Sequence, residues 1–260
     1  MPTVNQHAPG SFSWFELGTT DQDAAKNFYT RLFNWTSEDH PMGPGGVYTM
    51  FRLNGRDAAA GYTLNPQQRS QGVPPHWMIY IAVENADQTA GRAAELGATL
   101  MAPPFDVFDI GRMAVIADPT GAVFSIWQAK KHSGVGVIGE DGAFSWADLN
   151  TRDPESAKRF YGQLFGWNIT AGKDDPTGYL HIQNGEHYIG GIPSPKQIGN
   201  VPPHWLVYFH VSDCGKSLDR AADMDAQVLL PTTRLEHVGR FAVVKDPQGA
   251  AFALFEPEKK

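Results

Sequence analysis

The sequence of 260 residues contains only one cysteine, Cys214, so it forms no intrachain disulfide and no cysteine-based metal knuckle. No apolar run approaches the ~20 residues that a membrane-spanning helix needs. Residues 1–10 show no basic flank followed by an apolar stretch, so no secretory signal is visible. Basic residues are outnumbered by acidic ones, 21 to 28, for a net charge of −7, and they form no cluster. These absences predict a cytoplasmic protein that binds neither nucleic acid nor membranes, with Cys214 as a buried bystander.

What the sequence does contain is a long internal repeat. The tripeptide Phe-Ser-Trp at 12–14 recurs at 144–146, which is a displacement of 132 (144 − 12). The motif Val-Pro-Pro-His-Trp at 73–77 recurs at 201–205, which is a displacement of 128 (201 − 73). A period of this length predicts two duplicated domains rather than a solenoid.

Within each copy, residue periodicity predicts a strand followed by a helix and then by further strands. Alternation indicates a strand over 12–17, and Asp21 is a suitable N-cap for a helix with Ala25, Phe28, Tyr29 and Leu32 on one face. A hairpin is expected over 46–64 around Asn54-Gly55. A second round follows, with a strand at 76–83, a helix over 86–96 closed by Gly97, and strands near 99, 113–117 and 123–127.

These elements predict the domain organisation. The first domain is expected over 1–130, with modules at about 11–65 and 74–129, and the second over 143–260, with modules at about 143–195 and 202–257. Residues 131–142 contain four glycines and are expected to form a flexible linker.

The motifs resemble the glyoxalase, bleomycin-resistance and extradiol-dioxygenase superfamily, whose fold is called vicinal oxygen chelate. The similar features are an acidic residue opening a helix that carries Phe-Tyr and Leu-Phe, and a late Asp-Pro-x-Gly turn, at 118–121 and 246–249. The resemblance covers both repeats and is closest to a two-repeat branch labelled glyoxalase family proteins or hydroxylases. It implies an α+β fold of tandem glyoxalase-like domains, with four βαβββ modules forming two curved-sheet cups.

The resemblance also implies where a metal would be held. In metal-using members, His, Gln or Glu side chains from three strands point into the cup. The matching positions here hold residues that do not coordinate zinc, nickel or iron, namely Trp14, Met78 and Ser125 in the first repeat and Trp146, Leu206 and Ala253 in the second. A fourth carboxylate, expected near Gly61 or Gly190-Gly191, is absent too. We therefore expect no cofactor; the alternative is a displaced metal site built from His76, His204, His210 and Glu16. His76 and His204 are better explained as groups that bond backbone at a strand start.

Strand alternation predicts which side chains line each cup. The first cup is expected to present Trp14, Glu16, Met78, Tyr80, Val123, Ser125 and Trp127. The second is expected to present Trp146, Asp148, Leu206, Tyr208, His210, Ala251, Ala253 and Phe255.

The inward carboxylates of Glu16 and Asp148 have two interpretations. Either they contact a ligand or act as a general base, or they accept structural hydrogen bonds from Tyr, Trp or Arg, such as Arg112 or Arg240. Trp14 and Trp146 either stack against a ligand or fill the space of a lost metal.

Two functions follow from these readings. The first is a metal-free protein of the bleomycin-resistance type that binds or sequesters a small molecule in aromatic-lined cups. The alternative is a glyoxalase-like lyase, isomerase or dioxygenase that uses a displaced metal or the acid/base groups of Glu16, Asp148 or His210. The expected partner is a small-molecule ligand, and the chain is either a monomer with two pseudo-equivalent domains or a homodimer.

Overall fold

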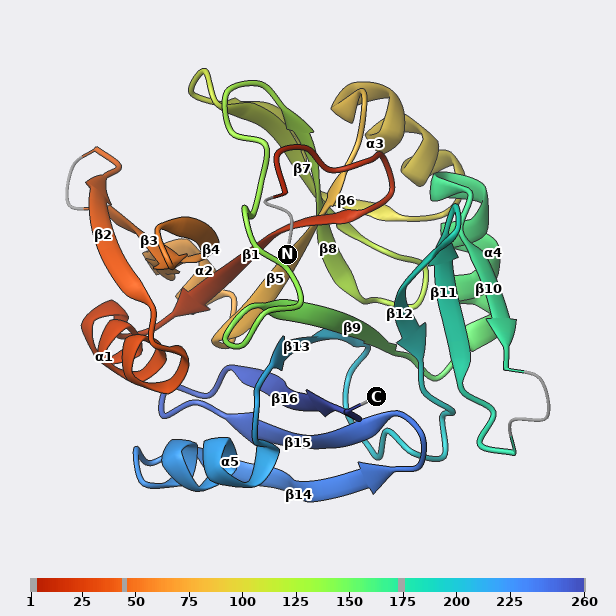
Figure 1. Cartoon of the computed structure of the whole chain (residues 1–260). Coiled ribbons are helices and arrows are strands. Elements are labelled where there is room, and N and C mark those ends of the chain that lie inside the picture. The colour runs from red at the N-terminus through yellow and green to blue at the C-terminus, as the bar shows by residue number, and fades with distance from the viewer. Residues whose placement is uncertain (1–3, 44–45, 173–175, 260) are drawn as a thin grey trace.

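A computed structural model of the chain describes residues 4–43, 46–172 and 176–259, and each repeat in it builds one mixed sheet (Figure 1). The first repeat consists of β1 (Phe12–Thr19), α1 (Gln22–Phe33), β2 (Thr36–Pro41), β3 (Val47–Leu53), β4 (Arg56–Thr63), α2 (Pro66–Ser70), β5 (His76–Ala82), α3 (Ala86–Glu95), β6 (Thr99–Val107), β7 (Gly111–Ala117) and β8 (Val123–Ala129). The second consists of β9 (Phe144–Asn150), α4 (Pro154–Phe165), β10 (Asn168–Ala171), β11 (Leu180–Asn184), β12 (His187–Ile192), β13 (His204–His210), α5 (Cys214–Ala222), β14 (Gln227–Leu235), β15 (Gly239–Lys245) and β16 (Ala251–Pro257).

The two sheets have the same strand order. It is β2-β3-β4-β1-β5-β8-β7-β6 in the first repeat and β10-β11-β12-β9-β13-β16-β15-β14 in the second. In both sheets the first strands of the two modules, β1 with β5 and β9 with β13, pair antiparallel at the centre. The modules therefore pair within a repeat and not across repeats, and the expected α+β fold with tandem glyoxalase-like domains is confirmed.

The long helices begin and end where the sequence signals them. The Asp21 side chain accepts a hydrogen bond from the Ala24 amide at the start of α1, and Asp153 does the same for Ser156 at the start of α4. Asp153 is followed by Pro154, whose fixed φ suits the first helical position. None of the helices in the described part of the chain is long and apolar enough to cross a membrane.

Each of these helices packs against the other repeat. Helix α1 lies beside α5, and α4 lies beside α3 (Figure 1). The ring of Phe28 in α1 contacts Phe252 in β16 with centroids 6.2 Å apart, and Tyr161 in α4 contacts Phe124 in β8 at 5.5 Å. The apolar core is therefore shared by the two repeats.

Two buried hydrogen-bonded bridges cross the boundary between the repeats. The Tyr29 hydroxyl donates to Asp246 Oδ2 at 2.8 Å and accepts from Trp77 Nε1 at 3.0 Å. Burial raises the pKa of the Asp246 carboxyl and raises that of Tyr29 well above its ordinary value. The second bridge consists of Trp205, Tyr161 and Asp118, with distances of 3.1 and 2.9 Å. We call these the crossed bridges.

The linker is not the flexible tether that its glycines predict. Its Val135 amide donates to the Ser13 carbonyl, and its Gly136 amide donates to the Asp57 carbonyl, both at 2.8 Å. Val135 and Val137 are buried. The linker thus bonds backbone carbonyls near the starts of β1 and β4, ahead of the first residues that pair between these two strands, Glu16 and Ala60.

Candidate functional site

The residues expected to line the first cup lie on one face of the first sheet. Trp14 pairs with Tyr80 and Glu16 with Met78 across β1 and β5, and Tyr80 pairs with Ser125 across β5 and β8. Residues directly opposite in a sheet point to the same side, so these side chains share a face. Trp127, opposite Ala82, extends the same face.

The second cup repeats this arrangement. Asp148 pairs with Leu206, and Tyr208 pairs with both Trp146 and Ala253. The opposite faces carry the core side chains, as expected from alternation, and Phe15, Leu17, Phe124 and Ile126 are fully buried there.

In the first cup, two tyrosines hold the carboxylate of Glu16. Tyr48 donates to Oε1 at 2.7 Å and Tyr80 donates to Oε2 at 2.8 Å. Trp14 Nε1 donates to the Tyr48 hydroxyl at 3.0 Å. Burial raises the pKa of the Glu16 carboxyl, although the two phenol hydrogen bonds act in the opposite direction. Glu16 itself remains partly exposed.

In the second cup, three donors hold the carboxylate of Asp148. Tyr179 donates to Oδ1 at 2.6 Å and Tyr208 donates to Oδ2 at 2.7 Å. Trp146 Nε1 donates to Oδ1 at 3.1 Å and also lies 2.8 Å from the Tyr179 hydroxyl. Asp148 is 5% exposed, and burial raises its pKa.

Among the described residues, Glu16 therefore accepts from two tyrosines and Asp148 from two tyrosines and a tryptophan, and neither accepts from Arg. Arg112 forms a two-pronged ion pair with Asp87 at 2.7 Å, and Arg240 is exposed. Asp148 Oδ1 accepts two donors, whereas Asp148 Oδ2 accepts one. Since each carboxylate oxygen has two lone-pair positions, Oδ2 keeps one acceptor position.

Tyr48 and Tyr179 are site residues that we did not expect from the sequence. They are counterparts, separated by 131 positions (179 − 48), so the repeat offset contained a signal for them. Tyr62 also lies near Glu16: burial and this carboxylate raise the pKa of Tyr62 to about 12.

The inner faces do not fit the metal implied by the resemblance. Besides the Trp, Met, Ser, Leu and Ala side chains already named, Ala60 stands opposite Glu16 on β4 and Gly191 stands opposite Asp148 on β12. A Cβ at Gly191 would lie 1.8 Å from the Tyr179 hydroxyl, so this phenol fills the space of a ligand side chain. Within residues 4–43, 46–172 and 176–259, no three His, Cys, Asp or Glu side chains gather into a possible metal site.

The histidines of the alternative site are not brought together. His76 Nδ1 and His204 Nδ1 each lie 2.8 Å from a proline carbonyl two residues earlier, as expected for groups at a strand start. His210 Nδ1 lies 2.9 Å from the Gly139 carbonyl. His210 is also four residues along β13 from Leu206, the partner of Asp148, which is about 13 Å. Cys214 is buried, and burial raises its pKa.

The linker covers one end of the first cup. The His132 ring meets Trp14 edge-on with centroids 4.5 Å apart, and the His132 carbonyl accepts from Trp127 Nε1 at 2.9 Å. Trp14 and Trp127 are only 5% and 6% exposed.

The corresponding end of the second cup is partly exposed. Its apolar surface is a cluster separate from the main core, with Leu206, Tyr208 and Ala253 buried at the base. The partly exposed members of this cluster are Trp146, Phe241, Val243, Ala251 and Phe255. We call this surface the open aromatic wall.

Comparison with known proteins agrees with this architecture. The family model described as Glyoxalase/Bleomycin resistance protein/Dioxygenase superfamily matches residues 11–126 and 143–254. The chain is 40% identical over 263 residues to "Putative glyoxylase CFP32" of Mycobacterium tuberculosis (strain CDC 1551 / Oshkosh), covering 99% of this chain and 98% of the relative. It is 33% identical over 270 residues to "Anthracycline biosynthesis protein DauV" of Streptomyces sp. (strain C5), covering 97% and 95%.

Solved structures share the fold at low sequence identity. The Mn(II)-bound glyoxalase from Novosphingobium aromaticivorans matches with a TM-score of 0.65 at 14% identity, covering 95% of this chain and 82% of that chain. The 2,3-dioxygenase LapB from Pseudomonas sp. KL28 matches with a TM-score of 0.63 at 13% identity, covering 100% and 94%.

Proposed function

Because the chain belongs to the glyoxalase, bleomycin resistance protein and dioxygenase superfamily, we propose that it binds a small organic molecule in the second cup without a metal ion. The observation that carries this proposal is the open aromatic wall. Apolar side chains left partly exposed on one face of a sheet, beside a few polar groups, match the usual lining of a small-molecule site.

The wall and the carboxylate below it would bind different parts of a ligand. Trp146, Phe241 and Phe255 offer ring faces and edges to a planar aromatic group. The remaining acceptor position of Asp148 Oδ2 suits a ligand hydroxyl. The name of the relative DauV connects that protein with anthracycline biosynthesis, which supports a fused-ring aromatic compound as the ligand class.

The absence of a metal requirement rests on the chemistry of the side chains. Trp, Leu, Ala and Gly occupy the inward positions from which the superfamily's metal ligands come, and none of them donates an electron pair to a cation. The described residues offer no substitute cluster.

A matched pair of substitutions tests the location of the site. Ala251 and Val123 are counterparts (251 − 128 = 123), and both are partly exposed. With dihydroxyanthraquinone as the probe in titration calorimetry, Ala251→Trp should abolish binding because it fills the second cup, whereas Val123→Trp should leave it unchanged. Loss of binding in Val123→Trp alone would assign the site to the first cup, and loss in neither variant would reject both cups.

Metal analysis tests the other half of the proposal. Protein purified without chelator should contain far less than one equivalent of zinc, nickel or iron. An ion that binds the native state would stabilise it and raise the melting temperature. Because we expect none of these ions to bind, adding each one should leave the melting temperature unchanged. One tightly bound equivalent would contradict metal-free binding.

An acid/base enzyme is the second candidate, and one observation favours it in the first cup. Glu16 is partly exposed and has a raised pKa, so it is placed to exchange a proton with a bound molecule. If a substrate is found, Glu16→Gln should abolish turnover and the isosteric Asp148→Asn should not. Full activity in Glu16→Gln would exclude this candidate.

A further inference from the structure

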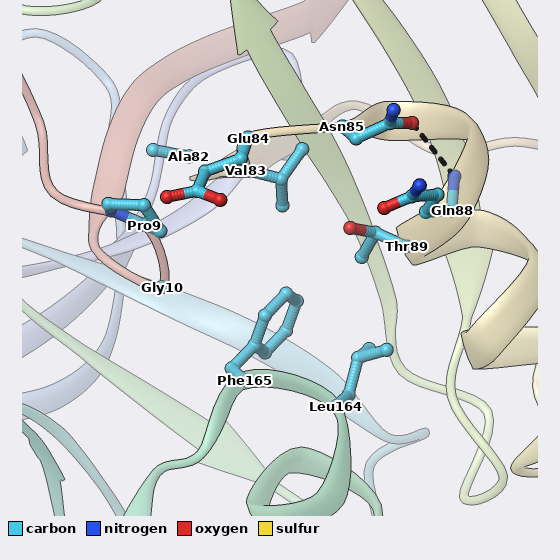
Figure 2. Close-up of a pocket in the computed structure, with 10 residues that line it drawn as sticks. All are labelled: Pro9, Gly10, Ala82, Val83, Glu84, Asn85, Gln88, Thr89, Leu164 and Phe165. Carbon is cyan, nitrogen blue, oxygen red and sulfur yellow. Dashed lines mark hydrogen bonds between the residues drawn. The ribbon is translucent and has the colours of Figure 1, made fainter.

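A cavity of about 230 Å³ lies at the junction of the two repeats and is lined by residues of both (Figure 2). Three segments line it: Pro9-Gly10, the region from the end of β5 into α3, and the end of α4. Figure 2 shows the side chains of Glu84, Gln88 and Thr89 on one side of the space, and those of Leu164 and Phe165 on the other.

Three polar side chains that line this cavity have no protein partners among the described residues. Across the described parts of the chain, no ion pair or hydrogen bond involves the carboxylate of Glu84, the carboxamide of Gln88 or the hydroxyl of Thr89. These three side chains nevertheless lie on the same cavity, above an apolar floor. Unpaired acceptors beside apolar surface are what an amphipathic ligand requires.

The equivalent junction on the other side of the molecule is built differently. There Phe33 and Leu32, the counterparts of Phe165 and Leu164, are buried, and the Phe33 ring contacts Phe209 with centroids 4.8 Å apart. The counterpart of Phe209 is the smaller Ile81 (209 − 128), so Phe165 lacks this contact and stays partly exposed.

The charges at the two junctions differ as well. Ser212 and Lys216 replace Glu84 and Gln88 (212 − 84 and 216 − 88 are both 128), and Lys216 pairs with Asp213 at 2.9 Å. The cavity is therefore not an unavoidable consequence of the duplication.

The surroundings of the cavity favour positive charge. Glu84 is anionic, and the C-terminal end of α4 at Phe165 adds the partial negative charge of its free carbonyls. The N-terminal end of α3 carries a partial positive charge that opposes this effect. That charge is reduced, because Asn85 accepts from the Gln88 amide and Gln128 accepts from the Ala86 amide.

We propose that this cavity is a binding site for a small organic ammonium ion with an apolar or aromatic tail. The ammonium group would donate to Glu84 and to the side-chain oxygens of Gln88 and Thr89, and the tail would lie on Leu164 and Phe165. A cation near the Phe165 ring gains a further attraction to its face. This site is independent of the second cup.

Phenethylammonium is a suitable probe, and phenethyl alcohol is its neutral control. Titration of the ¹⁵N-labelled full-length protein should shift the amides of Gly10, Gln88 and Thr89 saturably with the cation. The alcohol should bind at least fivefold more weakly, and added salt should weaken the cation alone. Equal binding of the two probes, or no saturable shift at these amides, would overturn the proposal.

Surface variants then identify the groups responsible. Glu84→Gln should weaken phenethylammonium binding about fivefold, the scale of an exposed ion pair, and Gln88→Lys, which introduces the residue of the other junction, should weaken it at least as much. Glu95→Gln removes an exposed acid at the far end of α3 and should change nothing. Unchanged binding in both Glu84→Gln and Gln88→Lys would also overturn the proposal. The Ala251→Trp variant should bind the probe normally, which separates this site from the second cup.

Discussion

The two cups contain the same hydrogen-bonded network but differ in what covers it. In each, a carboxylate on the first strand accepts from two tyrosines, and a tryptophan two residues earlier donates into the group. The linker covers the Trp14 end of the first cup and leaves Glu16 partly exposed, whereas the second cup buries Asp148 and leaves Trp146 partly exposed. Duplication thus preserved the network, and the single linker made the two copies unequal.

The largest expected effect comes from removing one donor in each network. Tyr208→Phe should lower the free energy of unfolding by about 2 kcal/mol, because it leaves the buried Asp148 carboxylate short of a charge-assisted hydrogen bond. Tyr80→Phe should cost about 1 kcal/mol, since water reaches the partly exposed Glu16. Urea denaturation measures both values, with the exposed Tyr188→Phe as the control. Equal losses would show that the two carboxylates are equally shielded from water.

The pH dependence of stability should distinguish the cups next. Burial raises the folded-state pKa of Asp148, so the native state holds a proton that the unfolded state releases above pH about 4. As the pH rises from about 4 to the higher pKa of the folded state, the free energy of unfolding of the wild-type protein should fall relative to that of Asp148→Asn. The fall should be at most about 1.4 kcal/mol per pH unit. Glu16→Gln should give the same sign and a smaller slope. A wild-type protein that gained stability relative to Asp148→Asn would contradict the raised pKa.

Removing the cover should make the first cup resemble the second. His132→Ala deletes the ring that lies against Trp14 and should cost about 1 kcal/mol while exposing the indole. With 5-fluorotryptophan labelling, a paramagnetic agent dissolved in the solvent should broaden the ¹⁹F resonance of Trp14 in the variant more than in the wild-type protein. His187→Ala, at an exposed histidine, is the control. An unchanged Trp14 resonance would show that other residues cover the cup.

The smallest effect concerns the base of the first cup. Ser125 is fully buried, and its hydroxyl has no hydrogen-bond partner among the described residues, whereas its counterpart in the second cup is Ala253. Ser125→Ala should therefore be neutral or stabilising by up to about 1 kcal/mol, and Ala253→Ser should destabilise by about 1 kcal/mol, as thermal unfolding would show. A clear loss in Ser125→Ala would indicate that the hydroxyl is satisfied.

Much of the fold could be predicted from the sequence because buried sheet faces impose a strict alternation. That rule placed Glu16 and Asp148 on the inner faces and Phe15 and Phe124 on the outer ones. Strand β2 has no buried residue, so it carries no alternation signal, and we did not predict its position.

Other features depend on tertiary packing. The Gly-rich composition of the linker predicts a flexible chain, but Val135 and Val137 find apolar partners that composition does not reveal. Tyr48 and Tyr179 were missed because the repeat offset falls from 132 to 128 between the helix and the second module, which obscures counterparts in that region.

The crossed bridges bear on how the chain could be divided. A break within the linker would leave the polypeptide in two fragments, yet Tyr29 would still need Asp246, and Tyr161 would still need Asp118. Each fragment alone would expose to solvent a carboxylate and a helix face that are buried in the intact protein. The two repeats should therefore stay associated without the peptide linker. A protein cleaved within the linker should remain assembled as a heterodimer, and the separate fragments should regain structure only when mixed.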